Sequence, residues 1–182
     1  AYQGLVGAYL SQGKHAEALA VAREGLKLMP GSARALSLLG DVHAAQPGAE
    51  AAGKAMKLYD SALRMQPGCV DATLSLADLH VREGRLDQAV GLLQQHLATT
   101  AAPDPGVQAT LHARLASVLT EAKRFGEAVG QHQAALSLNP QLEESRNGLE
   151  RVEKLMKGLD PDVDDEEASE VDEEDEDEED EE

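Results

Sequence analysis

Two short stretches of the sequence resemble motifs that bind nucleotides or calcium, but neither motif is complete. Residues 48–55 read GAEAAGKA, whereas a phosphate-binding loop needs Ser or Thr after its lysine, to hold magnesium, and a strand before it. Ala55 fills that position, and the residues before the stretch have a helical pattern. Asp160, Asp162 and Asp164 begin like a calcium loop, which requires Gly at its sixth place, where this chain has another aspartate. We therefore interpret the first stretch as a helical turn that contains glycine and the second as part of an acidic run.

The histidines and the single cysteine form no recognisable catalytic or metal-binding pattern. None of the six histidines is spaced with Cys or Glu as metal ligands are, and no HExxH sequence occurs. His43 and His80 are instead expected to pack in the core. Cys69 cannot form a disulfide within the chain, which fits a reducing compartment, and we interpret it as a small apolar filler. The sequence therefore predicts a protein that is not an enzyme and that needs no cofactor or metal.

The negative charge of the chain is confined to its last residues. The sequence has 34 acidic and 16 basic residues, and 18 of the acidic ones but none of the basic ones lie in residues 160–182. The remaining 159 residues are therefore neutral, which argues against nucleic-acid binding. A run of like charge with few apolar residues is expected to be disordered. We interpret it as a solubilising tail, with contact to a basic protein as the alternative, and Ser169 as a candidate phosphorylation site.

Neither end of the chain carries a signal for secretion or membrane insertion. No apolar run approaches the ~20 residues that cross a bilayer, and no basic segment followed by an apolar core opens the chain. The chain starts at Ala1 in the middle of a helix-like pattern, without an initiator Met, so we expect it to be the C-terminal piece of something longer.

One phrase recurs four times along the chain, which predicts a helical repeat. Its copies end in ALAVAREGLKLMP, AMKLYDSALRMQP, AVGLLQQHLATTA and AVGQHQAALSLNP. Small residues and leucines alternate at helical spacing, and Leu5, Leu39, Leu76 and Leu115 are expected to form the apolar stripe of the first helix of each unit. Turns are expected at Gly13 and Gly84, where glycine permits positive φ, whereas the fourth unit has Lys123 there.

The repeat resembles the tetratricopeptide family. Its period is close to that family's 34 residues, and all four aromatic residues fall where the family's register usually has one: Tyr2, Tyr9, Tyr59 and Phe125. The resemblance implies an all-α, right-handed α-α superhelix. Residues 1–140 would form four helix-turn-helix repeats, residues 141–158 a capping helix that closes the stack, and residues 159–182 the disordered acidic tail.

The resemblance also implies where a partner would bind. Proteins of this shape usually hold extended segments on the inner face, which the first helix of each repeat lines. Transferring the family's groove positions to this chain gives Gln3, Leu10, Arg34, Ser37, Asp41, Leu74, Asp78, Arg82 and Ser117. Chaperone-binding members grip a terminal carboxylate with Lys, Arg and Asn. The two asparagines of this chain lie outside the first helices, so that grip is not expected here.

Three stretches resemble more narrowly the C-terminal repeats of the subunit 7 family of the anaphase-promoting complex. They are AYQGLVGAYL, the third repeat, and EAVGQHQAALSLNPQLEESRNGLERVEK followed by acidic residues. The resemblance implies a non-catalytic scaffold subunit of a cell-cycle ubiquitin ligase, in the nucleus and cytoplasm. Its partners would be other tetratricopeptide subunits, and a homodimer would form through N-terminal repeats that are absent here. The alternative is a general peptide-binding adaptor or a histone-chaperone-like module that uses the acidic tail.

Overall fold

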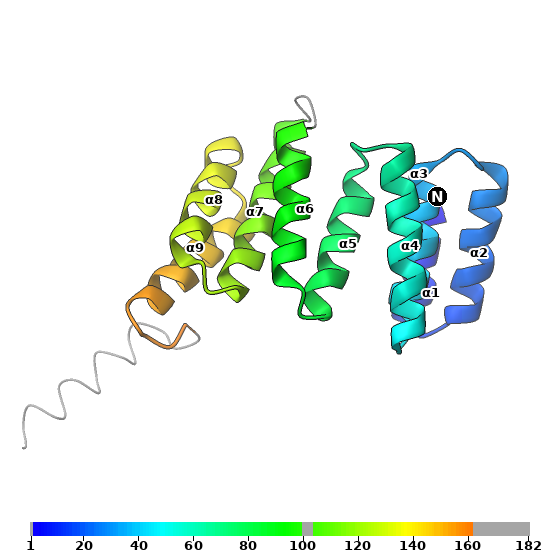
Figure 1. Ribbon diagram of the computed structural model, residues 1–182, viewed down its shortest axis with the longest axis horizontal. Coiled ribbons are helices and arrows are strands. Elements are labelled where there is room, and N and C mark those ends of the chain that lie inside the picture. The colour runs from blue at the N-terminus through cyan, green and yellow to red at the C-terminus, as the bar shows by residue number, and fades with distance from the viewer. Residues whose placement is uncertain (1, 100–103, 162–182) are drawn as a thin grey trace, which may run out of the picture.

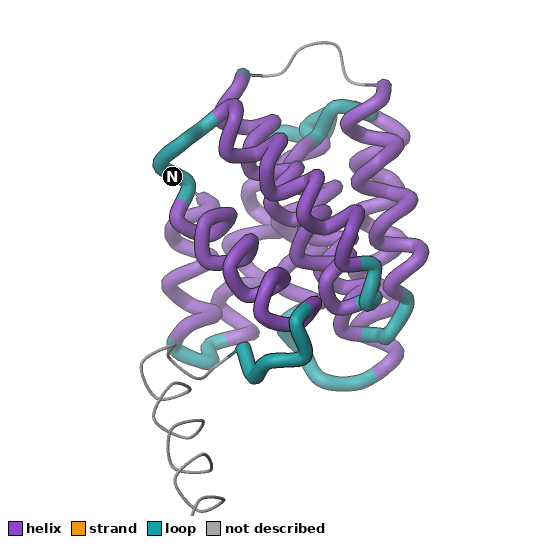
Figure 2. The backbone as a smooth tube through the Cα atoms, turned by 90° about the vertical axis from the view of Figure 1, so that its left-hand side faces the viewer, coloured by secondary structure: helices purple, strands orange, loops and turns teal. Residues whose placement is uncertain are grey.

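The computed structural model describes residues 2–99 and 104–161, and this part of the chain is entirely helical. The helices follow one another along the long axis of the molecule (Figure 1). Their bounds are α1 Tyr2–Ser11, α2 His15–Leu28, α3 Ala33–Ala44, α4 Ala49–Met65, α5 Val70–Arg82, α6 Leu86–Thr99, α7 Pro105–Glu121, α8 Phe125–Leu138 and α9 Glu143–Met156. Consecutive helices run in opposite directions, with the connections at the two ends of the layer (Figure 2). The predicted acidic tail beyond residue 161, Ser169 and residues 100–103 lie outside the described residues.

Local side-chain chemistry fixes several of the helix ends. The Ser32 hydroxyl accepts a hydrogen bond from the backbone N–H of Ala35 at 3.2 Å, which satisfies one of the free donors in the first turn of α3. The Asp104 carboxylate accepts from Gly106 N–H at 3.1 Å, and Pro105 occupies the first position of α7, where no N–H is needed. The stretch that resembles a phosphate-binding loop is the start of α4, directly after Gly48 with φ of 105°, and α3 precedes it instead of a strand.

The core between the helices is built largely from alanine. Small side chains that are buried at contacts between neighbouring helices include Ala18, Ala22, Ala55, Ala62, Ala72, Ala77, Ala89, Ala116, Ala128 and Ala135. Larger side chains fill the space that remains, and Tyr59, Leu93, Leu111 and Leu119 are fully buried. Small residues let helix axes come close, so the array is held by many close backbone approaches in place of a few large apolar residues.

The apolar stripe expected on the first helix of each pair is present except at its start. Leu76 and Leu115 are buried and Leu39 is half-buried, but 45% of Leu5 is exposed, so the expectation for Leu5 is wrong. The physical reason is that, within the described residues, α1 packs against α2 and α3 alone. Helices in the middle of the array have neighbours on both sides, whereas the outer side of α1 contacts no other described helix.

Lys123 adopts the backbone conformation that glycine adopts in the equivalent turns. Its φ is 59°, beside 70° at Gly13 and 72° at Gly84. The hydrogen bonds of the turn are the same, since the residue after each one donates to a carbonyl five residues back: Arg124 to Leu119 at 2.8 Å, Arg85 to His80 at 2.8 Å and Lys14 to Tyr9 at 2.9 Å. Left-handed backbone costs a non-glycine residue roughly 1–2 kcal/mol.

We expect Lys123→Gly to raise the free energy of unfolding by about 1 kcal/mol, because it removes this strain and the Lys123 side chain is exposed. Urea denaturation followed by circular dichroism measures the change. The matched reverse substitution is Gly84→Lys, which should lower the free energy of unfolding by a similar amount through backbone strain. Nothing lies within 4 Å of the Cβ that it adds, so a steric clash does not contribute. Equal stability of Lys123→Gly and the wild type would contradict the strain argument.

Two histidines are buried in the core without a full set of hydrogen bonds. His96 is 4% exposed, and its Nδ1 lies 2.8 Å from the Thr73 hydroxyl, which itself donates to the Cys69 carbonyl at 3.2 Å. Nδ1 and the Thr73 hydroxyl thus share one buried hydrogen bond, and the Nε2 atom has no partner among the described residues. His132 is 1% exposed, with no hydrogen-bond partner for Nδ1 among the described residues. Burial lowers the pKa of both histidines below the usual value, because it disfavours the charged ring.

Because the pKa values of these two histidines are lowered, we expect the free energy of unfolding to fall in mild acid. A histidine with a lowered pKa in the folded chain contributes its full stability above the ordinary pKa of 6.5, and this contribution is lost as the pH falls below that value, because the unfolded chain then binds more protons. The free energy of unfolding should fall from about pH 7.5 to about pH 5.5, by at most about 1.4 kcal/mol per pH unit for each histidine. The double variant His96→Gln with His132→Gln should flatten this dependence. An equal slope in the wild type and the double variant would contradict the assignment.

Candidate functional site

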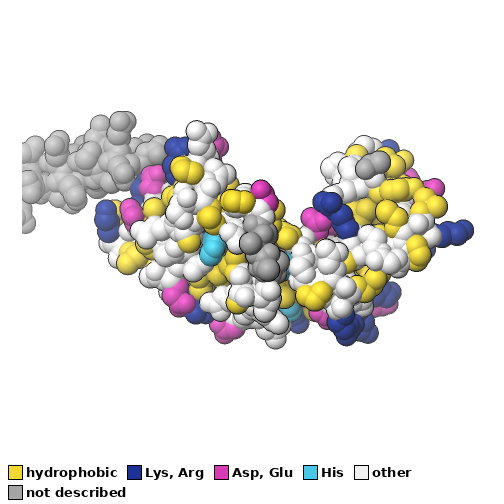
Figure 3. All heavy atoms as spheres, turned by 90° about the horizontal axis from the view of Figure 1, so that it is seen from above, with side chains coloured by type: hydrophobic (Ala, Val, Ile, Leu, Met, Phe, Trp, Pro, Cys, Tyr) yellow, Lys and Arg dark blue, Asp and Glu magenta, His cyan; other side chains and the backbone are white. Residues whose placement is uncertain are grey.

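The odd-numbered helices form one continuous face of the molecule. α1 contacts α3, α3 contacts α5, and α5 contacts α7, whereas the even-numbered helices of the described chain have no such contacts with one another. Seen from above, the molecular surface is hollowed between the two ends of the array, and hydrophobic, basic and acidic side chains all border the hollow (Figure 3). We call the face formed by α1, α3, α5 and α7 the inner face.

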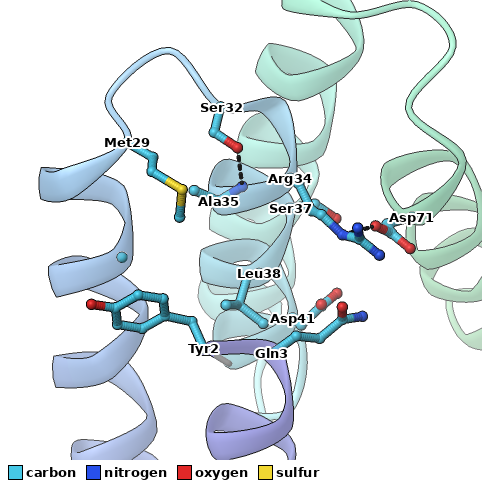
Figure 4. A pocket seen from close by; sticks show the side chains of 11 residues that line it. Tyr2, Gln3, Met29, Ser32, Arg34, Ala35, Ser37, Leu38, Asp41 and Asp71 are labelled. Carbon is cyan, nitrogen blue, oxygen red and sulfur yellow. Dashed lines mark hydrogen bonds and ion pairs between the residues drawn. The ribbon is translucent and has the colours of Figure 1, made fainter.

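The first cavity of the inner face lies between α1, the end of α2 and α3, and it encloses about 210 Å³. Its wall is mainly apolar, and its polar groups come from α1, from α3 with the preceding Ser32, and from α5 (Figure 4). The lining residues are Tyr2, Gln3, Gly25, Met29, Ser32, Arg34, Ala35, Ser37, Leu38, Asp41 and Asp71. Ser37 and Asp41 stand one helical turn apart on α3, so both are on its cavity side. The cavity can therefore hold an apolar group beside hydrogen-bonding groups.

A second cavity, of about 220 Å³, follows along the inner face between α3, α4 and α5. Its lining residues are Asp41, Ala44, Ala45, Tyr59, Ser75, Asp78 and Arg82. Asp41 lines both cavities, so its carboxylate stands at their junction. The Tyr59 hydroxyl donates a hydrogen bond to Asp41 Oδ1 at 2.8 Å, and the Tyr59 ring is fully buried between α3 and α4.

Two ion pairs link consecutive helices across the inner face. Arg34 Nε on α3 lies 2.7 Å from Asp71 Oδ2 on α5, and Arg114 Nε on α7 donates to Asp78 Oδ1 on α5 at 2.6 Å. Partly exposed pairs of this kind stabilise a fold by about 1 kcal/mol at most. Their main effect here is to occupy the charges of Asp71 and Asp78.

The environment of Asp41 disfavours its charge. Burial raises the pKa of the Asp41 carboxyl, and the charges of Asp71 and Asp78 raise it further. Hydrogen bonds from the Tyr59 and Ser75 hydroxyls act in the opposite direction and offset part of this effect. The pKa of the Tyr59 phenol is also raised, by burial first and by the adjacent Asp41 second. Asp41 is thus held in place by hydroxyl groups, and no Lys or Arg of the described chain lies within ion-pair distance of it.

The structure places the nine groove positions in two cavities, in two buried clusters and, for Ser117, within its own helix. Gln3, Arg34, Ser37 and Asp41 line the first cavity, and Asp41, Asp78 and Arg82 line the second. Leu10 and Leu74 pack against buried clusters, at α1–α2 and at α5–α7 respectively. The Ser117 hydroxyl donates to the Ala113 carbonyl of its own helix at 3.1 Å. The six positions that line the cavities cluster about one junction, and one of them, Arg82, also donates to the Ala44 carbonyl at 3.0 Å.

Sequence reasoning missed several residues of the junction. Asp71 and Ser75 were not identified as groove positions, nor was Arg114, although it neutralises Asp78. A signal for one of them was present, because Asp71 follows Arg34 by 37 residues, the interval that also separates Asp78 from Asp41. Positions one period apart lie side by side in a stacked repeat. No equivalent signal points to Arg114.

The described residues contain neither a cluster of metal ligands nor a helix that could span a membrane. Within 2–99 and 104–161, no three His, Cys, Asp or Glu side chains gather in a way that could hold a metal ion. In the same residues no helix has the length and apolar character of a membrane span.

Two family models of known proteins match the chain, and both describe the same kind of repeat. Two models of the tetratricopeptide repeat match, one at residues 5–58 and the other at residues 48–115. A solved structure, a thermophilic TPR protein of Thermus thermophilus, superimposes with a TM-score of 0.66 at 20% identity, covering 80% of this chain and 76% of that one. This likeness shows the fold, and the predicted all-α tetratricopeptide solenoid is confirmed.

Curated relatives share a name. The chain is 48% identical to anaphase-promoting complex subunit 7 of Arabidopsis thaliana over 166 residues, which are 91% of this chain and 28% of the relative. It is 32% identical to anaphase-promoting complex subunit 7 of Homo sapiens over 172 residues, 92% of this chain and 29% of the relative. The chain thus spans less than a third of the length of these relatives. Together with the two repeat matches, which cover residues 5–115, these findings show that the chain belongs to the tetratricopeptide repeat family.

Proposed function

We propose that the chain is a non-catalytic scaffold element of an anaphase-promoting complex, a cell-cycle ubiquitin ligase, and that its repeat array holds other repeat subunits of that complex. The observation that carries the proposal is the 48% identity to a subunit 7 over 91% of the chain. In this proposal residues 1–140 form four repeats and residues 141–158 close the array. The protein then acts in the nucleus and cytoplasm, where the complex works.

The distribution of polar and apolar surface supports contacts along the array in preference to its C-terminal end. α9 turns Val152 into the core, whereas Arg146, Glu150 and Glu153 are exposed. A charged outer face of this kind ends a stack, as terminal repeats of solenoids do. Partners are therefore expected on the inner face and along the edges of the array.

One such edge carries exposed apolar side chains at the ends of two equivalent helices. Leu28 at the end of α2 is 63% exposed and Met65 at the end of α4 is 49% exposed, and the two positions are 37 residues apart. Large apolar side chains that repeat along one edge favour a contact driven by apolar burial. Such a contact differs in its salt response from one driven by the acidic residues 160–182.

The test is affinity purification of the full-length protein from its own cells, followed by mass spectrometry. Wild type and a version truncated after Leu159 are compared, each washed at about 0.15 M and about 1 M salt. We expect ligase subunits with both versions and at both salt concentrations, because apolar contacts resist screening. Recovery mainly of basic proteins, lost at high salt and on truncation, would refute the scaffold role and favour an acidic adaptor.

A further inference from the structure

The junction of the two inner-face cavities contains one carboxylate that has no cation partner among the described residues. Asp71 and Asp78 each have an arginine partner, at Nε–O distances of 2.7 Å and 2.6 Å. Within residues 2–99 and 104–161, the partners of Asp41 are two hydroxyl groups, those of Tyr59 and Ser75. Asp71 and Asp78 are the charged groups that act on Asp41, and both disfavour its charged form.

Leaving Asp41 unpaired has an energetic consequence. A carboxylate removed from water loses hydration energy, and hydrogen bonds from neutral hydroxyls return only part of it. A cation that reached Asp41 would restore the remainder, and a charge-assisted hydrogen bond is about twice as strong as a neutral one. A positively charged ligand would therefore stabilise the Asp41 carboxylate relative to the free protein.

A second, independent group at the junction also lacks a partner. The Ser37 side chain is 1% exposed, lines the first cavity, and its hydroxyl has no hydrogen-bond partner in the described part of the chain. A buried hydroxyl without a partner is uncommon in folded proteins. Ser37 lies one turn before Asp41 on α3, so a donor that enters the cavity can reach hydroxyl and carboxylate together.

The arginines around the junction are unsuited to a negatively charged ligand. Arg34 and Arg114 are engaged with Asp71 and Asp78, and Arg82 donates to the Ala44 carbonyl at 3.0 Å. An anion would have to break one of these contacts, whereas a cation would meet a carboxylate that is already in place. The apolar wall of the first cavity, which includes Tyr2, can accommodate the methylene groups of a long basic side chain.

We propose that the junction of the two cavities binds a lysine or arginine side chain of an extended partner segment on the inner face, with Asp41 as the charged acceptor and Ser37 as the neutral one. This inference rests on the proposed function in one respect, that the ligand is part of a protein. It assigns the inner face a preference opposite to that of the chaperone-binding repeats, which select carboxylates.

The test uses the full chain and three synthetic peptides of about ten residues that are identical and uncharged except at one central position. That position is arginine, citrulline, which has nearly the same shape without the charge, or glutamate. Binding is followed by amide chemical shifts, so that a contact with α3 and α5 is distinguished from attraction of a basic peptide to residues 160–182. The protein variants are Asp41→Asn and, as a control with the same change of charge, Asp60→Asn, which alters an exposed carboxylate of α4 at another cavity.

We expect the arginine peptide to shift amides around Ser37 and Asp41, and Asp41→Asn to weaken this binding about tenfold, as the loss of one charge-assisted hydrogen bond predicts. Binding of the citrulline peptide should be weaker in the wild type and unchanged by Asp41→Asn. Asp60→Asn should leave the affinity for arginine unaltered. Equal affinity of wild type and Asp41→Asn, or shifts confined to residues 160–182, would overturn the proposal, whereas recovery of ligase subunits in the purification experiment would be unaffected by that result.

Discussion

Replacement of Gly40 by alanine is expected to lower the free energy of unfolding by about 2 kcal/mol, although alanine is the better helix former. Gly40 lies in the middle of α3, directly against the buried ring of Tyr59 on α4. A Cβ at this position would stand 2.5 Å from Cε1 and 2.9 Å from Cδ1 of that ring. The ring is fully buried and its hydroxyl is bound to Asp41, so it cannot turn away without losing that hydrogen bond.

The control for this prediction is Gly53→Ala in α4, where nothing lies within 4 Å of the added Cβ. That substitution should stabilise the protein by up to about 1 kcal/mol through helix propensity alone. Chemical denaturation of both variants and of Gly40→Ala combined with Tyr59→Ala isolates the contact, because the alanine should cease to be harmful when the ring is absent. A stabilised Gly40→Ala variant would show that α3 and α4 are packed less closely than described. Gly40→Ala should also weaken the binding of a cation at Asp41, because displacing the Tyr59 ring moves the hydroxyl that holds the Asp41 carboxylate.

Replacement of Gly148 by alanine is expected to loosen α9 from the array, at a cost of about 2 kcal/mol. A Cβ on Gly148 would stand 2.5 Å from Nε2 of His132, whose ring is buried between α8 and α9. The ring fills the space that glycine leaves, and Val152, one turn further along α9, is also fully buried. Because α9 packs against α7 and α8 alone among the described helices, the effect should be local.

Amide hydrogen exchange measures this local effect. Protection of α9 should fall sharply in Gly148→Ala, while protection of α3 to α6 changes little, as expected for a repeat array in which each unit contacts its neighbours. Gly130→Ala on the exposed side of α8 is the control, because nothing lies within 4 Å of its added Cβ. Unchanged protection of α9 in Gly148→Ala, or equal loss along the whole array, would contradict the proposed role of His132 as the contact that fits α9 to α8.

The two glycine predictions also mark a limit of sequence reading. Gly40 stands 37 residues before Ala77, at the same position of the repeat, so the register marks both as small residues between close helices. Gly148 was not, because its partner His132 belongs to a different helix pair and the capping helix has no second copy with which it can be compared. His96 and His132 were likewise absent from the expected core, whereas His43 and His80, which were expected there, are only half-buried. A histidine is as compatible with the surface as with the core, so its burial depends on what surrounds it.

The sequence by itself determined the helical class and the period of this protein, because those features depend on local chemistry that repeats. Turn residues such as Gly13 and Gly84 act within one connection, and apolar spacing acts within one helix, so each is readable without knowledge of any neighbour. The family's register was enough to place Ser37, Asp41 and Asp78 on the first helices of their repeats.

Only the tertiary structure decided what those polar residues do. The rotation from one helix pair to the next brings Asp71 to Arg34 and Asp78 to Arg114. In the part of the chain that the structure describes, it leaves Asp41 with the Tyr59 hydroxyl and without a cation. That rotation follows from the summed packing of many small side chains. The sequence gives the type of each charged residue. Whether its charge is paired depends on distances of a few ångströms between repeats, and the packing of the helices sets those distances.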